Sequence, residues 1–281
     1  MQRISLQRFR ERAASADRLL APLLSLVFFY VATHILLTWA RFPFPQWGNL
    51  IAVGVATALA VAIWERGQWS LGLIVAPHLA LPEFLRGMTW GFLLISGCAT
   101  LIVLSTDIGH GPGRGFPWLE LLAVFFPAVL HEELLFRGYP FQKLLRWSRP
   151  FALLVVALIF AALHAGNSSA TTIGLVNVFL GGILLGLAYE RYGRLWFPIG
   201  LHLAWNLTTG PILGHEVSGY ESMHTLFIER GGGPELLTGG EFGIEGSIWM
   251  TFTELVAIAL MIRGRPNMIR ADGVKHADIK E

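Results

Sequence analysis

The chain contains long blocks of apolar residues, most of them close to the length of a membrane-crossing helix. A helix needs about 20 mostly apolar residues to cross the hydrocarbon layer of a bilayer. A membrane β-barrel needs alternating apolar and polar residues instead, whereas residues 151–160 are continuously apolar. The sequence therefore predicts an all-α, polytopic membrane bundle with about eight transmembrane helices. The eight blocks are 19–40, 50–64, 88–105, 117–141, 151–165, 171–189, 197–210 and 247–262.

Composition agrees with a membrane protein and excludes several other classes. Only 14% of the residues are Asp, Glu, Lys or Arg, against about 25% in soluble domains. This balance argues against an ordinary soluble enzyme, a disordered chain and a basic nucleic-acid binder, so no nucleic-acid partner is expected. The single cysteine, Cys98, excludes a disulfide framework and a cysteine-rich metal site.

The basic residues predict how the bundle is oriented. If the N-terminus is cytoplasmic and all eight blocks cross, 18 of the 21 Lys and Arg residues lie on the cytoplasmic side. Only Arg41, Arg114 and Arg230 lie on the other side. The positive-inside rule expects this asymmetry, and one missed crossing would invert every later loop. We therefore expect both termini in the cytoplasm and a multi-pass protein of the bacterial inner (plasma) membrane.

Three segments lie outside the blocks. Residues 1–18 are basic and form either an amphipathic helix on the inner leaflet or a disordered, positively charged tail. The transmembrane bundle is predicted over 19–262, followed by a basic cytoplasmic tail over 263–281. The long loop 211–246 is rich in glycine and holds six glutamates and one arginine, which predicts an outer-side location.

Polar residues inside the fourth block form the first candidate site, because ionisable groups in hydrocarbon are costly and need a partner or a purpose. Glu133 and Arg137 are four residues apart, so they face each other across one helical turn and neutralise each other. Glu132 projects about 100° away from Glu133 on a helix. A carboxylate in low-dielectric surroundings is a candidate proton acceptor near neutral pH.

Two further polar groups follow on later blocks. If the fourth and fifth helices turn near Ser148, Glu132 and His164 are each 16 residues from the turn and lie at the same depth. In the seventh block His202 and Asn206 project from one helix face. Both can donate hydrogen bonds, as a developing oxyanion requires.

Each of these groups also has a purely structural interpretation. A charged pair can simply hold two helices together, and a single buried histidine can be a hydrogen-bonded core residue. His34 and Asn177 are isolated in their blocks and are interpreted as helix-packing residues. Glu254 has no partner in its own block, so it is either a further site residue or a residue near the outer surface.

The three motifs taken together resemble a known family. Glu132-Glu133-x-x-x-Arg137, Phe160-x-x-x-His164 and His202-x-x-x-Asn206 occur in this order on separate apolar blocks. This pattern resembles the CPBP (Abi) family of CAAX-processing and bacteriocin-processing intramembrane proteases, which includes the Ras-converting CAAX endopeptidase. The resemblance covers about residues 117–209, which we expect to form the catalytic core, and no motif position departs from the family pattern.

The resemblance implies a role for each motif residue. Glu132 would be the general base, and His164 would help to bind and polarise the attacking water. His202 and Asn206 would complete the water site and form the oxyanion hole. The supporting residues would be Glu133, Arg137 and Phe160.

The need for a metal is open at this stage. Glu132, His164 and His202 could hold a catalytic zinc ion with one open position, although the sequence is not an HExxH zincin. We favour water activation by the glutamate without a metal, and zinc is the alternative cofactor.

The implied function is an intramembrane endopeptidase acting on a membrane-attached or lipidated protein within the bilayer. Prenylated CAAX tails, leader peptides and sortase-like C-terminal anchors are all candidate substrates. Two other functions compete with this one. The first is a catalytically silent scaffold or immunity factor on the same fold. The second is a proton-coupled transporter in which Glu132, His164 and Glu254 form a proton relay.

Overall fold

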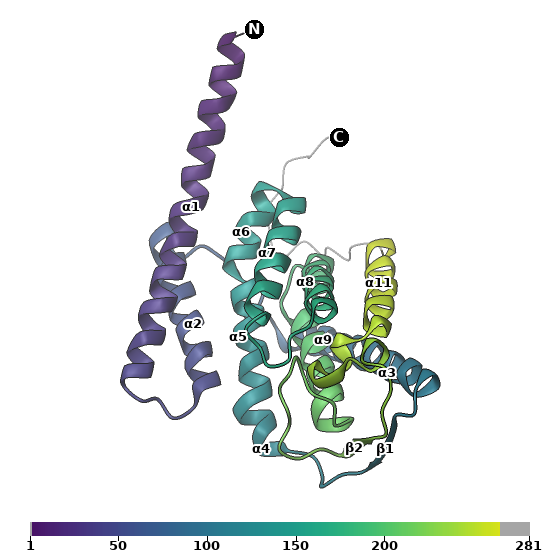
Figure 1. The fold of residues 1–281 in the computed structure, drawn as a ribbon. Helices are drawn as coiled ribbons and strands as arrows, with labels where there is room; N and C mark the ends of the chain where they lie inside the picture. Colours follow the sequence, from purple (N-terminus) through teal and green to yellow (C-terminus); the bar gives the residue numbers. More distant parts are fainter. Residues whose placement is uncertain (1, 265–281) are drawn as a thin grey trace. The chain divides into compact units, whose positions relative to one another are not determined.

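The described residues are mostly helical, as the apolar blocks predict (Figure 1). The computed structural model describes the backbone of residues 2–264 and the side chains of residues 19–264. The predicted tail over 263–281 lies outside the described residues beyond Gly264. The elements are α1 (Gln2–Trp39), α2 (Pro45–Trp64), α3 (Pro77–Ser105), β1 (Gly109–Pro112), α4 (Trp118–Glu120), the π-helical segment η1 (Leu121–Phe125), α5 (Phe126–Phe136), α6 (Tyr139–Trp147), α7 (Arg149–His164), α8 (Thr172–Tyr192), α9 (Trp196–Leu207), the π-helical segment η2 (Thr208–Ile212), β2 (Phe227–Arg230), α10 (Glu235–Thr238), the 3-10 turns η3 (Gly240–Phe242) and η4 (Ile244–Gly246), and α11 (Ile248–Arg263).

Four of the described helices are long and apolar enough to cross a membrane. They comprise residues Leu19–Trp39 of α1, then α2, α3 and α8, while α7 is apolar but shorter. Large apolar side chains are exposed on them, including Phe28 at 67% and Leu104 at 77%. Exposed apolar surface of this extent is expected where a helix faces lipid. The chain is therefore an integral membrane protein by the length, composition and surface of its helices.

The fourth apolar block is not the single helix that the sequence predicts. It is divided into α4, η1, α5 and α6, with a break between Phe136 and Tyr139. Pro127 lacks the N–H that an α-helix would use here, and the wider π turn η1 precedes it. At the break, a Cβ on Gly138 would lie 2.1 Å from the Leu134 carbonyl oxygen, so only glycine fits. The prediction that Glu132 lies 16 residues along one continuous helix from a turn at Ser148 is therefore wrong, because α5 ends before α6 begins.

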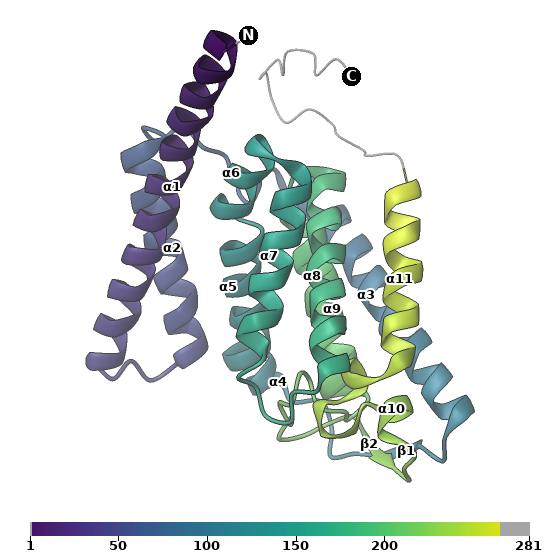
Figure 2. The same ribbon diagram turned by 45° about the horizontal axis from the view of Figure 1, so that its top comes forward.

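The chain divides into two compact units, which are described separately. The first unit contains the chain up to Leu71 together with Trp118–Ala152. In it α1 and α2 lie side by side, and α2 packs against α5 (Figure 2). Its core cluster consists of Leu26, Ala56, Ala60 and Tyr139, bordered by side chains such as Trp69.

The second unit contains Gly72–Pro117 and the chain from Leu153 onward. Here α9 packs against α3 and α8, and α11 packs against α8 and α3. The antiparallel strands β1 and β2 pair near α10 (Figure 2), with Gly109 opposite Arg230. Helix α8 begins at an N-cap, Thr171, whose side chain accepts a hydrogen bond from the Gly174 N–H, and it ends at Gly193 with φ 63°. These signals fix the ends of the central helix of the unit.

Glycines permit the close packing of α9 against α3. A Cβ at Gly87 would lie 2.1 Å from the Phe197 carbonyl oxygen, and one at Gly91 would lie 2.2 Å from that of Leu201. On the opposite helix, a Cβ at Gly200 would lie 2.2 Å from the Phe84 carbonyl oxygen. Small residues let two membrane helices approach at backbone distance. This contact determines the position of α9, the helix that carries the third motif.

Candidate active site

The first motif lies on α5, in the first unit. Arg137 Nη1 donates a hydrogen bond to Glu133 Oε1 at 3.1 Å, and neither side chain is exposed to any extent. The ion pair that the i,i+4 spacing predicts is therefore present. Glu132 is partly buried and lies on the same helix.

His131, the residue before the two glutamates, connects α5 to α1. Its Nε2 lies 3.0 Å from the Tyr30 hydroxyl, and the two rings stack with centroids 5.8 Å apart. No motif of the sequence includes either residue. The sequence does not predict the contact between His131 and Tyr30, because the two residues are 101 positions apart. The contact holds the first motif helix against α1.

The second and third motifs lie on α7 and α9, in the second unit, and Phe160 connects them. The Phe160 ring lies 4.5 Å from the His164 ring and 6.3 Å from the His202 ring, measured between centroids. Both histidine rings therefore lie beside the same phenylalanine ring of this unit. Asn206 lies one turn after His202 on α9 and is partly buried, whereas His202 is only 7% exposed.

The hydrogen bond of His164 fixes which ring nitrogen is available for chemistry. Its Nδ1 lies 2.8 Å from the Phe160 carbonyl oxygen. A carbonyl can only accept, so Nδ1 carries the proton of this bond. In the neutral ring Nε2 then presents its lone pair, which can accept a hydrogen bond from water or bind a metal. The backbone of α7 thus selects the tautomer of His164.

The candidate residues are divided between the two compact units of the chain. Glu132, Glu133 and Arg137 belong to the first unit, and Phe160, His164, His202 and Asn206 belong to the second. Within the part of the chain whose side chains are described, no group of three or more His, Cys, Asp or Glu residues is arranged to hold a metal ion.

The other isolated polar residues have different surroundings. Asn177 donates to the carbonyls of Glu245 and Ser247 at 2.7 and 2.8 Å, so it packs α8 against the start of α11. Glu254 is fully buried, and neither of its carboxylate oxygens has a hydrogen-bond partner among the described residues. Its carboxylate is therefore enclosed by protein.

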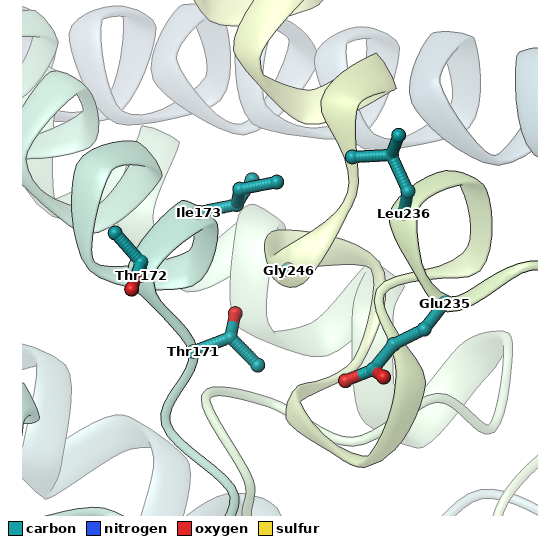
Figure 3. A pocket seen from close by; sticks show the side chains of 6 residues that line it. All are labelled: Thr171, Thr172, Ile173, Glu235, Leu236 and Gly246. Atoms are coloured by element: carbon teal, nitrogen blue, oxygen red, sulfur yellow. The ribbon is translucent and has the colours of Figure 1, made fainter.

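An open pocket of about 300 Å³ lies at the N-terminal end of α8 (Figure 3). Thr171, Thr172 and Ile173 line one side of it, and Glu235 and Leu236 of α10 line the other, as Figure 3 shows. None of the motif residues lines it. The pocket is therefore separate from the candidate catalytic residues.

Comparison with known proteins points to one family for the motif region. Residues 114–208 match a family model described as type II CAAX prenyl endopeptidase Rce1-like. A protein of Escherichia coli, named "Uncharacterized 24.3 kDa protein", is 35% identical over 88 residues. The aligned part makes up 30% of this chain and 40% of that relative, so the chain spans less than half the length of the relative. No solved structure matches the chain.

The matched segment includes all seven motif residues, from Glu132 to Asn206, and so confirms the resemblance seen in the sequence. Residues 114–208 of this chain are thus similar to the Rce1-like type II CAAX prenyl endopeptidases.

Proposed function

We propose that the protein is an intramembrane endopeptidase that hydrolyses a peptide bond near the end of a membrane-attached substrate. The family of residues 114–208 supports this class of reaction. The observation that carries the proposal is the contact of Phe160 with both His164 and His202. This contact joins the second and third motifs, as a shared catalytic centre requires.

In the proposed reaction Glu132 and His164 activate one water molecule. The water donates one hydrogen bond to the Glu132 carboxylate and one to Nε2 of His164, the nitrogen left available by the Phe160 carbonyl. The water oxygen attacks the peptide carbonyl carbon while Glu132 takes the proton. No covalent acyl-enzyme forms.

The other motif residues stabilise charge and return the proton. The carbonyl oxygen becomes negative during attack, and His202 and Asn206 are proposed to donate hydrogen bonds to it. The C–N bond then breaks, and Glu132 passes its proton to the departing amine. Glu133 and Arg137 neutralise each other beside this carboxylate, which avoids a second uncompensated charge in the bilayer.

The experiment is a comparison of the termini of membrane proteins, by mass spectrometry, in cells with and without the gene. Wild type should generate a shifted terminus that Glu132→Gln and His164→Ala variants do not generate, at equal protein levels. His78→Ala, which changes an exposed histidine of α3 outside the motifs, is the matched control and should cleave normally. Full biological activity of both motif variants would contradict the proposal and favour a scaffold.

A zinc ion held by Glu132, His164 and His202 is the alternative means of water activation. One carboxylate and two imidazoles suit zinc chemically, and metal-bound histidines usually donate their other N–H as His164 does. We propose the metal-free reaction, which predicts full cleavage after complete chelation. Activity that is lost on chelation and returns only with added zinc would show that a metal takes part.

A further inference from the structure

Glu245 in the turn before α11 is a buried carboxylate that the family motifs do not include. It is 5% exposed, and it accepts hydrogen bonds from two other segments of the second unit. Its Oε1 accepts from the Trp205 indole N–H at 2.5 Å. Its Oε2 accepts from the Ser218 hydroxyl at 2.6 Å and from the Ser218 backbone N–H. Three donors thus surround one carboxylate.

The backbone beside Glu245 is fixed independently of these bonds. Asn177 on α8 donates to the carbonyls of Glu245 and Ser247, and its side-chain oxygen accepts from the Thr251 hydroxyl at 2.6 Å. The Ser247 side chain caps α11 by accepting from the Met250 N–H. The carboxylate therefore projects from a rigid turn, and Trp205 is held to it.

Trp205 belongs to the third motif helix, three residues after His202 and one before Asn206. It is 6% exposed. At the other end of the indole ring, Trp205 Cη2 lies beside Gly181 of α8, at the 3.6 Å of an ordinary van der Waals contact with a Cβ there. The indole is therefore contacted at both ends, which restrains rotation of α9 about its own axis in addition to the packing of α9 on α3. That rotation determines where His202 and Asn206 point.

We propose that Glu245 is a positioning residue of the active site. It acts through Trp205, fixes the rotation of α9, and thereby aims the two hydrogen-bond donors of the third motif. The inference rests on the proposed endopeptidase function. A carboxylate is needed because all three neighbouring groups donate, and a glutamine would turn its amide N–H toward one of them.

The kinetic test uses the full-length protein and the substrate identified by terminus mapping. We expect Glu245→Gln to lower kcat by roughly 10- to 100-fold with little change in KM, because misaimed donors weaken the transition state. Trp205→Phe should cause a similar loss, and the double variant should lose no more than either single variant. Glu241→Gln is the matched control, since Glu241 lies in the same loop and accepts an exposed bond from Ser169.

A second readout does not depend on activity. In ¹⁵N-indole spectra, the Trp205 resonance is identified as the one that is missing from Trp205→Phe. Glu245→Gln should shift this resonance and leave the other tryptophan resonances in place. If wild type cleaves nothing, the proposed function fails while this measurement still tests the contact. If Glu245→Gln does not fold, Trp205→Phe carries the kinetic test. Normal kcat in a folded variant with a shifted resonance, or additive losses in the double variant, would overturn the positioning role.

Discussion

The two adjacent glutamates of the first motif have different environments, although the sequence makes them look alike. Glu133 is completely buried in an ion pair with Arg137, whereas Glu132 is partly exposed. Glu133→Gln removes the carboxylate that pairs with the fully buried Arg137 guanidinium. We expect it to lower the free energy of unfolding by about 3–5 kcal/mol, as for other broken buried pairs. Thermal unfolding in detergent measures this loss.

Two controls separate stability from catalysis at this motif. Glu132→Gln should unfold at the wild-type temperature while losing cleavage. Replacing both members of the pair, in Glu133→Gln with Arg137→Met, should recover much of the lost stability because no isolated charge remains. Equal stability of Glu133→Gln and wild type would show that the ion pair is not needed for the fold.

At the scale of single residues, spacing within a helix predicts local contacts and nothing further. The Glu133–Arg137 pair follows from i,i+4 spacing, and it is present. Glu245 could not be singled out, because its partners Trp205 and Ser218 lie 40 and 27 residues away. It looks like any of the six glutamates of the loop 211–246. Only the folded loop shows that it is buried.

At the scale of elements, the glycines of α3 determine how closely the third motif helix approaches. The spacing Gly87-x-x-x-Gly91 is a recognisable signal for close packing of membrane helices, but the sequence analysis did not use it. The periodicity of apolar residues does not tell which helix packs on which. The partner of α3 is α9, which begins 91 residues after Ser105.

We expect Gly91→Ala to destabilise the protein by about 1–3 kcal/mol, the usual cost of overpacking. A Cβ at this position would lie 2.2 Å from the backbone oxygen of Leu201, and backbone cannot move aside as a flexible side chain can. Gly97→Ala in the same helix is the matched control, because nothing lies within 4 Å of its Cβ position. That change should be neutral or stabilise by up to about 1 kcal/mol.

The measurement is the unfolding midpoint in detergent together with cleavage by the folded fraction. Because α9 carries His202 and Asn206, Gly91→Ala should also reduce cleavage per folded molecule. A Gly91→Ala protein as stable and as active as Gly97→Ala would contradict the close approach of α3 and α9.

A polar cluster that should respond to pH lies at the paired strands β1 and β2. His215 Nδ1 donates to Glu229 Oε2 at 2.5 Å, and the Nε2 atoms of His215 and His110 are 3.0 Å apart. The hydrogen bond from His215 lowers the pKa of Glu229. Burial lowers the pKa of His110 below its ordinary 6.5, and the charge of His215 adds to this shift. Burial raises the pKa of the neighbouring Glu216.

These shifts predict that the β1–β2 pairing loses stability on acidification. A lowered histidine pKa means that the unfolded state binds more protons, so the stability is fully present above pH 6.5 and declines below it. The Glu229 contribution is lost below its ordinary 4.5. The raised pKa of Glu216 acts in the opposite direction and above 4.5, because the folded carboxyl takes up its proton at a higher pH than the unfolded one. A His110 variant therefore identifies the part of the pH dependence that belongs to this histidine.

Amide hydrogen exchange across β1 and β2, corrected for the intrinsic pH dependence, measures this effect. Protection should fall between pH 7.5 and about 5.5 in wild type. This fall should be absent from His110→Gln, whereas His224→Ala, at an exposed histidine of the same loop, should behave like wild type. Constant protection in wild type would exclude the cluster as a pH-sensitive contact.

At the scale of the whole molecule, the length of the apolar blocks predicts the fold class, whereas the distribution of basic residues predicts the membrane topology. The all-helical class follows from the continuous apolar blocks, and four helices of spanning length are present. The π segments η1 and η2 adjoin α5 and α9 directly, so helical backbone runs over residues 118–136 and 196–212. The block predicted around α5 is interrupted after Phe136, before α6 begins. Hydropathy averages over such breaks and therefore does not show them.

The eight-span topology rests on the charge asymmetry, and labelling of single cysteines tests it. The native thiol, Cys98, is buried, so a Cys98→Ser background is suited to one added thiol at a time. Gly232→Cys, in the loop 211–246, should react with a membrane-impermeant reagent in intact cells. Gln68→Cys, between α2 and α3, should react only after permeabilisation, since both positions are exposed in the structure. Labelling of both from the same side would require an even number of crossings between them, whereas the positive-inside argument requires an odd number.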